Sequence, residues 1–106
     1  MNQIIFSGKL DSGAIIIEFT DPGGFTGYNS GELLGRNWFE VFIPDAAIVE
    51  VLEVFQGLFY GGEPKLDNCN MICCKDGSQK MISFKNKIIK DRRGKSEFVF
   101  FTAVEV

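Results

Sequence analysis

The stretch GYNSGELLGRNWFEVFIP, residues 27–44, decides the fold that the sequence predicts. Asn29 or Ser30 can cap a short helix, and Gly35 stands where a left-handed C-terminal cap is favoured. The aromatic run after Gly35 predicts a second short helical turn that ends before Pro44. We interpret the whole stretch as a helical connector across one face of an antiparallel sheet. A binding site should then lie between the connector and the sheet.

Two strand-like runs precede the connector, at residues 3–10 and 14–20. Both runs are rich in β-branched and aromatic residues, which favour extended backbone. Asp11, Ser12 and Gly13 between them have the chemistry of a tight turn. The two runs therefore predict a hairpin.

A longer amphipathic helix is predicted after the connector, over about residues 46–60, with Asp45 as its N-cap. Acidic and amide residues lie on one face of this helix, and apolar residues recur at helical spacing on the other. The apolar face comprises Ile48, Val51, Leu52, Phe55 and Phe59.

Three further strand-like runs follow, at residues 65–74, 79–90 and 96–105. The Asp-Gly turn within residues 75–78 and the loop at 91–95 predict two hairpins between them. The order of elements predicts an α+β fold, in which a five-stranded antiparallel sheet carries the helical connector on one face. A chain of 106 residues fits a single domain, 1–106.

Composition excludes several classes of function. The net charge of −3 gives no reason to expect binding to nucleic acid or to an anionic membrane surface. No apolar run approaches the roughly 20 residues of a membrane span, so we expect no membrane insertion. The chain has no His and no paired Cys motif, which argues against His-based catalysis and against a metal site. Cys69, Cys73 and Cys74 are interpreted as reduced thiols of a cytoplasmic protein.

An ordered set of short motifs resembles the PAS domain, the sensory module of bacterial signalling proteins such as sensor histidine kinases. The set covers nearly the whole chain, although no single motif is specific. It consists of residues 26–28 (TGY), 32–37 (ELLGRN) and 75–78 (KDGS). The segment before Thr26 is shorter and richer in glycine than the family pattern, so we expect the first helix of that pattern to be reduced to a turn.

The resemblance implies a choice of cofactor, and missing residues argue against two of the options. The haem-binding members need a His on the main helix, and the chain has none. Flavin photosensors of the LOV type place a reactive Cys after the Gly-Arg-Asn motif, where this chain has Trp38 and Phe39. Their flavin-reading amides correspond here to Ile72, Ile82 and Ala103. We therefore predict no haem ligated by His and no flavin adduct.

The hairpin register predicts which strand residues face the connector, and so which could line a ligand pocket. Asn70 and Asn86 are polar residues on this mainly apolar face. They either bond to loop backbone or a buried water, or form a polar spot in a pocket. Trp38 either packs as core or walls a cavity, and Arg36 resembles the family position that forms a salt bridge to the main helix. The pocket candidates are Asn70, Asn86, Trp38, Arg36, Ile82, Phe84, Phe101 and Ala103.

The last strand is apolar on both faces, although an antiparallel strand with one solvated face should alternate with polar residues. Phe98, Phe100 and Val104 on the outer face therefore need a cover. We predict that a second copy of the chain, or an adjacent signalling domain, covers them.

These features favour a non-catalytic sensory and interaction domain, excised from a longer protein in which it regulates an output such as a histidine kinase of a two-component system. The alternative is a sensor whose pocket binds a small metabolite or a non-covalent cofactor. An enzyme would need an inward-facing base. Asp67 and Glu105 are the nearest strand acids, and their expected positions do not provide one.

Overall fold

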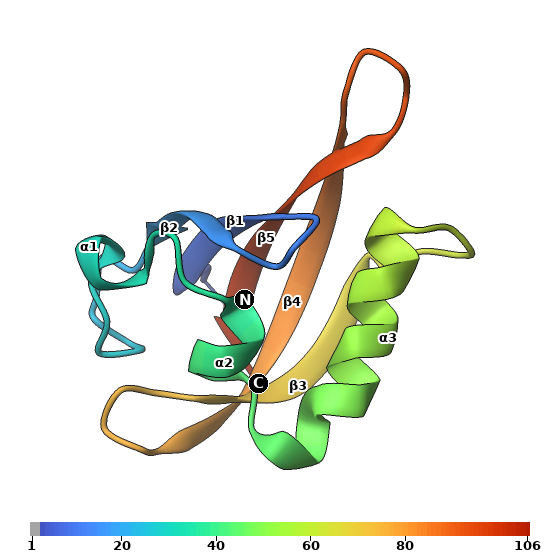
Figure 1. Cartoon of the computed structure of the whole chain (residues 1–106). Helices are drawn as coiled ribbons and strands as arrows, with labels where there is room; N and C mark the ends of the chain where they lie inside the picture. The colour runs from blue at the N-terminus through green and yellow to red at the C-terminus, as the bar shows by residue number, and fades with distance from the viewer. Residues whose placement is uncertain (1–2) are drawn as a thin grey trace.

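Five antiparallel strands form one sheet in the computed structural model, which describes residues 3–106 (Figure 1). Their spatial order is β2-β1-β5-β4-β3, so β5 lies in the middle of the sheet, between β1 and β4. The strands are β1 (Phe6–Asp11), β2 (Ile16–Thr20), β3 (Asp67–Cys73), β4 (Gln79–Lys90) and β5 (Ser96–Glu105). The predicted α+β fold and the three C-terminal strands are confirmed.

The first hairpin differs from the prediction because its turn is longer. The strand predicted over residues 3–10 begins at Phe6, and the one predicted from residue 14 begins at Ile16. The Asp11 carboxylate accepts hydrogen bonds from the backbone N–H groups of Gly13 (2.8 Å) and Ile15 (3.0 Å). Ala14 has a φ of 62°, in the left-handed region. A residue in that conformation cannot continue a strand, so β2 starts after it.

Two short helices form the predicted connector, α1 (Ser30–Leu33) and α2 (Trp38–Phe42). Asn29 caps α1 in a capping box with Glu32, and Asn37 caps α2 by accepting from the two backbone N–H groups of Phe39 and Glu40. Gly35 has a φ of 86°, which confirms the predicted left-handed residue after α1.

The main helix begins later than predicted and is not capped by Asp45. A 3₁₀ turn, η1 (Asp45–Ala47), precedes α3 (Ile48–Phe59), and the side chain of its N-cap residue makes no hydrogen bond. Asp45 therefore lies inside a helical turn, where its charge still favours the positive end of the helix dipole. The predicted apolar face is also shifted: Leu52 is 39% exposed, whereas Leu58 is buried with Val51 and Phe59.

A compact turn replaces the helix that the family pattern places between β2 and α1. The two Asp21 oxygens accept from the backbone N–H groups of Phe25 (2.9 Å) and Thr26 (2.8 Å), and the Thr26 hydroxyl also donates to Asp21 (2.7 Å). Thr26 is buried, and its carbonyl accepts a bond from the backbone N–H of Lys75 at 2.8 Å. The expected reduction of this segment is confirmed.

The hydrophobic core lies between the sheet and the helices, and Figure 1 shows α2 and α3 on the same side of the sheet. Gly8 of β1 makes room for a core aromatic ring: a Cβ at Gly8 would lie 2.7 Å from Cζ of Phe101 and 2.8 Å from the Glu18 carbonyl oxygen. The absence of a side chain at Gly8 therefore lets Phe101 lie against the backbone of β1.

Candidate functional site

A small cavity lies between α3 and the inner face of the sheet, where the sequence predicted a binding site. Its volume is about 40 Å³, which is room for one or a few waters and far below the roughly 300–1,000 Å³ of typical ligand pockets. It is partly open to solvent, and its walls are formed by α2, α3 and the strands. Its lining residues are Leu10, Trp38, Phe39, Val51, Val54, Phe55, Leu58, Asn68, Asn70, Phe84, Asn86, Val99 and Phe101.

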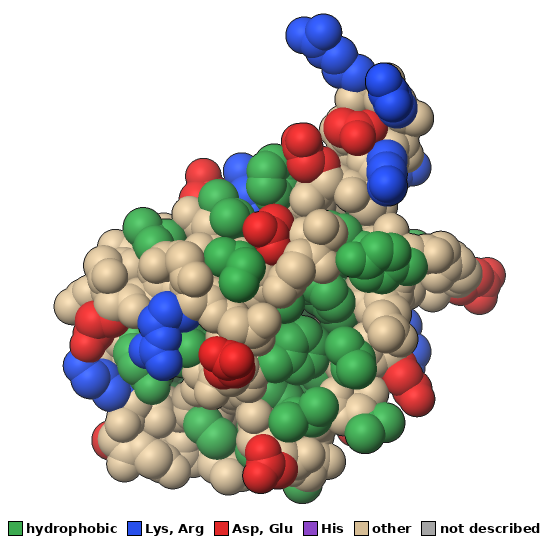
Figure 2. Space-filling model, in the orientation of Figure 1, with side chains coloured by type: hydrophobic (Ala, Val, Ile, Leu, Met, Phe, Trp, Pro, Cys, Tyr) green, Lys and Arg blue, Asp and Glu red, His purple; other side chains and the backbone are tan. Residues whose placement is uncertain are grey.

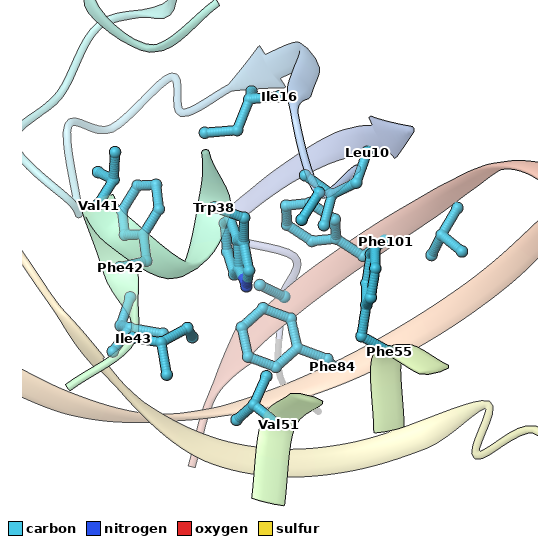
Figure 3. Packing of buried hydrophobic residues seen from close by; sticks show 14 of the residues in the cluster. Leu10, Ile16, Trp38, Val41, Phe42, Ile43, Val51, Phe55, Phe84 and Phe101 are labelled. Atoms are coloured by element: carbon cyan, nitrogen blue, oxygen red, sulfur yellow. The ribbon is translucent and has the colours of Figure 1, made fainter. Parts of the chain in front are cut away.

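Aromatic rings occupy most of the space beside this cavity. Trp38 lies at the centre of the cluster in Figure 3, with Phe42 on α2 and with Phe84 and Phe101 on the strands. The Trp38 ring centroid is 4.6 Å from that of Phe42, 4.9 Å from that of Phe101 and 5.9 Å from that of Phe84. Trp38 is 5% exposed. It therefore acts both as core and as a cavity wall.

Three amides form a hydrogen-bonded ladder along one side of the cavity. Asn86 Nδ2 donates to Asn68 Oδ1 (2.7 Å), and Asn68 Nδ2 donates to Asn70 Oδ1 (2.9 Å). The ladder ends on backbone, since Asn70 Nδ2 donates to the Met71 carbonyl at 3.0 Å and Asn86 Nδ2 also reaches the Lys65 carbonyl at 3.3 Å. Asn70 is buried, and its polar atoms are satisfied by this chain of bonds.

The other pocket candidates lie away from the cavity. Ile82 and Ala103 are fully buried in the core, outside the lining. Arg36 is exposed on the connector, and among residues 3–106 it makes no ion pair with α3. The pKa of Glu32 is lowered mainly by its hydrogen bond with Lys75, and the charge of Arg36 makes the smallest of the contributions. The sequence reasoning placed Asn68 on the inner face but missed its role as the middle member of the ladder, although the alternation of β3 carries that signal.

An ion pair ties the connector to the β3–β4 hairpin. Lys75 Nζ donates to Glu32 Oε1, and it lies 5.8 Å from the centroid of the Tyr28 ring. The hydrogen bond from Lys75, together with the one from the Asn29 backbone, holds the pKa of Glu32 below its ordinary value. On the same hairpin, burial raises the pKa of the Cys74 thiol. The ion pair of Glu32 and the burial of Cys74 both fit a structural role for the contact between the connector and the β3–β4 hairpin.

The outer face of the sheet carries half-buried Phe98, Phe100 and Val104. Two lysines lie directly beside Phe100 in the sheet, Lys9 on β1 and Lys87 on β4. Lys9 Nζ also lies 5.2 Å from the centroid of the Phe98 ring. The apolar stems of these lysines cover part of the aromatic surface, so the face is less uniformly apolar than β5 alone indicates.

Comparison with known proteins assigns the family. A family model described as a PAS fold matches residues 24–102. The chain therefore belongs to the PAS family of sensory domains. No curated protein matches the chain significantly in sequence.

Solved structures share the fold at low sequence identity. The PAS domain of the Cronobacter turicensis quorum-sensing receptor RpfR, in complex with BDSF, is 21% identical, with a TM-score of 0.78 over 100% of this chain and 95% of that chain. Drosophila melanogaster Cycle PAS-B, with bound ethylene glycol, is 15% identical, with a TM-score of 0.76 over 93% and 98%. A PAS domain from a two-component sensor histidine kinase is 17% identical, with a TM-score of 0.69 over 95% and 84%.

Two kinds of feature are missing from the described part of the chain, residues 3–106. None of its helices has the length and apolar character that a membrane span requires. No group of three or more Cys, Asp or Glu side chains in it could hold a metal ion.

Proposed function

We propose that this PAS domain is a non-catalytic sensory and interaction module that regulates an attached cytoplasmic signalling output, of which a histidine kinase of a two-component system is the first candidate. The domain works without haem ligated by His, because the chain has no His, and without the flavin adduct of LOV photosensors, because Trp38 and Phe39 follow the Gly-Arg-Asn motif.

The observation that carries this proposal is the contrast between the two faces of the sheet. The inner face meets a cavity of only about 40 Å³. The outer face presents half-buried Phe98, Phe100 and Val104, with a lysine on each side of Phe100, a surface suited to a second copy or to an adjacent domain. A change of contact at this outer face can bias an output between two states.

Native mass spectrometry of the protein from its natural host tests this function. We expect the mass of the bare polypeptide or of a whole multiple of it. ATP-dependent autophosphorylation of the full protein would then change when Val104→Asp alters the outer face. A stoichiometric bound molecule would contradict the proposal and favour the ligand-dependent alternative.

The amide ladder favours a second candidate, a sensor that depends on a small ligand in the same cavity. Asn68, Asn70 and Asn86 supply amide groups beside apolar and aromatic walls, a combination found in pockets that orient an amphiphilic ligand. The similar RpfR domain has been solved in complex with C12:0. A ligand of this size would need the aromatic rings around Trp38 to move apart.

Thermal unfolding with added C12:0 distinguishes the two candidates. A sensor of such ligands gains stability as the concentration rises, and Asn86→Leu removes that gain while Ser83→Ala, on the outer face, keeps it. If the domain is instead an interaction module without a ligand, C12:0 should not stabilise it. The Asn86→Leu variant should then purify with the same bound molecules, if any, as the wild type.

A further inference from the structure

The two edges of the sheet differ in how they are protected. The β2 edge is covered by the connector: Gly35 N donates to Ile16 O (2.9 Å), Ile16 N to Arg36 O (2.9 Å) and Trp38 N to Ala14 O (2.8 Å). The other edge strand is β3, and within residues 3–106 it pairs only with β4. Figure 1 shows β3 as the outermost strand, with α3 lying beside it.

The register identifies the backbone groups of β3 that point away from the sheet. Leu66 O accepts from Asn86 N (2.7 Å), and Cys74 N donates to Ser78 O (2.8 Å). In an antiparallel pair the bonded residues alternate along the strand. The even-numbered residues therefore bond to β4, and the N–H and C=O groups of the odd-numbered ones face the open side. These are Asp67, Cys69, Met71 and Cys73.

The open side of β3 also lacks the usual protection of edge strands. Natural edges are blunted by Pro, Lys, bulges, short length or a covering helix or loop, and here a groove separates β3 from α2, η1 and the start of α3. β3 has seven residues, no Pro and no Lys, and its register with β4 has no shift. Its one charged residue is Asp67. The Met71 carbonyl accepts from Asn70 Nδ2, but a carbonyl has a second lone pair for another donor.

A groove runs along this edge, between β3 and the start of the main helix. Its volume is about 840 Å³. On the helical side it is lined by Ile43, Pro44 and three carboxylates, those of Glu40, Asp45 and Glu50, and its lining contains no Lys or Arg. The groove continues past Glu50 into a smaller hollow of about 220 Å³ that contains Lys65 and Asp67. The larger groove therefore combines unpaired backbone with negative charge.

We propose that the open edge of β3 binds an extended peptide segment of a partner protein, which adds a strand to the sheet and places Lys or Arg side chains against Glu40, Asp45 and Glu50. Backbone hydrogen bonds to an edge strand supply affinity, and side chains at alternate positions supply specificity. A second copy of this chain pairing through its own β3 is disfavoured, because it would bring the same carboxylates into the groove.

Fluorescence anisotropy with labelled peptides tests this site. The probe is a decapeptide of alternating Val and Lys. Its matched controls are the same peptide with N-methyl groups on alternate amides and a Val-Glu peptide. We expect the Val-Lys peptide to bind at least about tenfold more tightly than either control, because N-methylation removes the backbone donors and Glu reverses the charge. Chemical shifts of the bound protein should change at residues 67–73.

Two protein variants locate the binding to this edge. Met71→Pro removes a backbone N–H that points away from the sheet and leaves the hydrogen bonds to β4 intact. We therefore expect a folded protein that no longer binds the Val-Lys peptide. Met71→Leu keeps the N–H and should keep the binding. Glu50→Lys should lower the affinity for the Val-Lys peptide severalfold and leave the far-UV circular dichroism spectrum unchanged.

Several results would overturn the proposal. Equal binding of the N-methylated and unmodified peptides would show attraction by charge alone, and equal binding of the Val-Glu peptide would remove the role of the carboxylates. Self-association that is lost in Met71→Pro would assign the edge to a second copy instead. The peptide comparison stands by itself if Met71→Pro fails to fold.

Discussion

At the scale of single residues, the inner site is built from two kinds of side chain, aromatic rings and amides. Aromatic rings around Trp38 fill space, while Asn68, Asn70 and Asn86 satisfy one another instead of exposing an unpaired amide. A buried polar group without a partner costs about 1–3 kcal/mol. The ladder avoids this cost without using a single backbone group of the helices.

Replacing Trp38 tests how much the packing of its ring contributes to the stability of the domain. We expect Trp38→Ala to lower the free energy of unfolding by about 3–5 kcal/mol, because it leaves a larger cavity among buried rings. Urea titration followed by circular dichroism measures this loss. Trp38→Phe should cost clearly less, and equal losses for the two variants would mean that the indole does not fill the cavity.

The three cysteines should differ in reactivity. Cys69 is exposed, Cys73 is half-buried and Cys74 is buried with a raised pKa. Since the thiolate is the reactive form, iodoacetamide should modify Cys69 first and Cys74 last. Peptide mass spectrometry over time gives the order, and early modification of Cys74 in folded protein would contradict its burial.

At the scale of elements, the connector is fixed at both ends by local hydrogen bonds. Asn29 and Asn37 cap its two helices, and Glu32 links it to the β3–β4 hairpin through Lys75. The first cap was predicted as Asn29 or Ser30, because Asn followed three residues later by Glu is a local capping pattern. The ion pair was not, because it joins residues 43 positions apart in the sequence.

The Glu32–Lys75 pair predicts a contribution to stability that depends on pH. The pKa of Glu32 is lower in the folded state than its ordinary value of 4.5. The contribution is therefore complete above pH 4.5 and is lost as the pH falls through the lower, folded value. Thermal unfolding between neutral and acid pH should show a smaller acid-induced loss in Glu32→Gln than in the wild type. Glu53→Gln, which removes an exposed carboxyl of α3, is the control, and an equal change in both variants would exclude a specific effect.

At the scale of the whole molecule, the sheet separates an inner face packed against helices from an outer face on which no helix of residues 3–106 lies. Figure 2 shows the helical side, where hydrophobic side chains gather over α3. The basic β4–β5 hairpin projects beyond the rest of the molecule. Any association through the outer face must therefore also accommodate this hairpin.

The outer-face prediction can be checked by sedimentation. If the face joins two copies, we expect the wild type to associate as its concentration rises and Phe100→Glu to remain monomeric, because the exchange removes the aromatic ring from the contact and adds a carboxylate that association would have to desolvate. Thr20→Glu, at the margin of the same face, should associate as the wild type does. If the wild type stays monomeric at all concentrations, a second copy does not cover this face. An adjacent signalling domain is then the remaining predicted partner.

Much of this architecture could be predicted from local patterns, and the misses share a physical cause. The alternation of Asn68, Asn70 and Ile72 placed the inner face correctly, since period and register are local properties. The predicted start of β2 was wrong because Ala14 adopts a left-handed conformation. The predicted cap of α3 was wrong because Asp45 lies in a 3₁₀ turn. The volume of the cavity could not be predicted, because it depends on how rings from four elements pack together.

The pairing of β1 with β5 has a consequence for synthesis of the protein. Phe6 on β1 packs against Phe101 and lies beside Ala103 in the sheet, and both of these residues are synthesised long after the first hairpin. At about 5–20 residues per second, the first hairpin waits roughly 5–15 s for its neighbour. During this interval its aromatic face is open to solvent and to chaperones, so we expect the yield of folded domain to depend on translation speed.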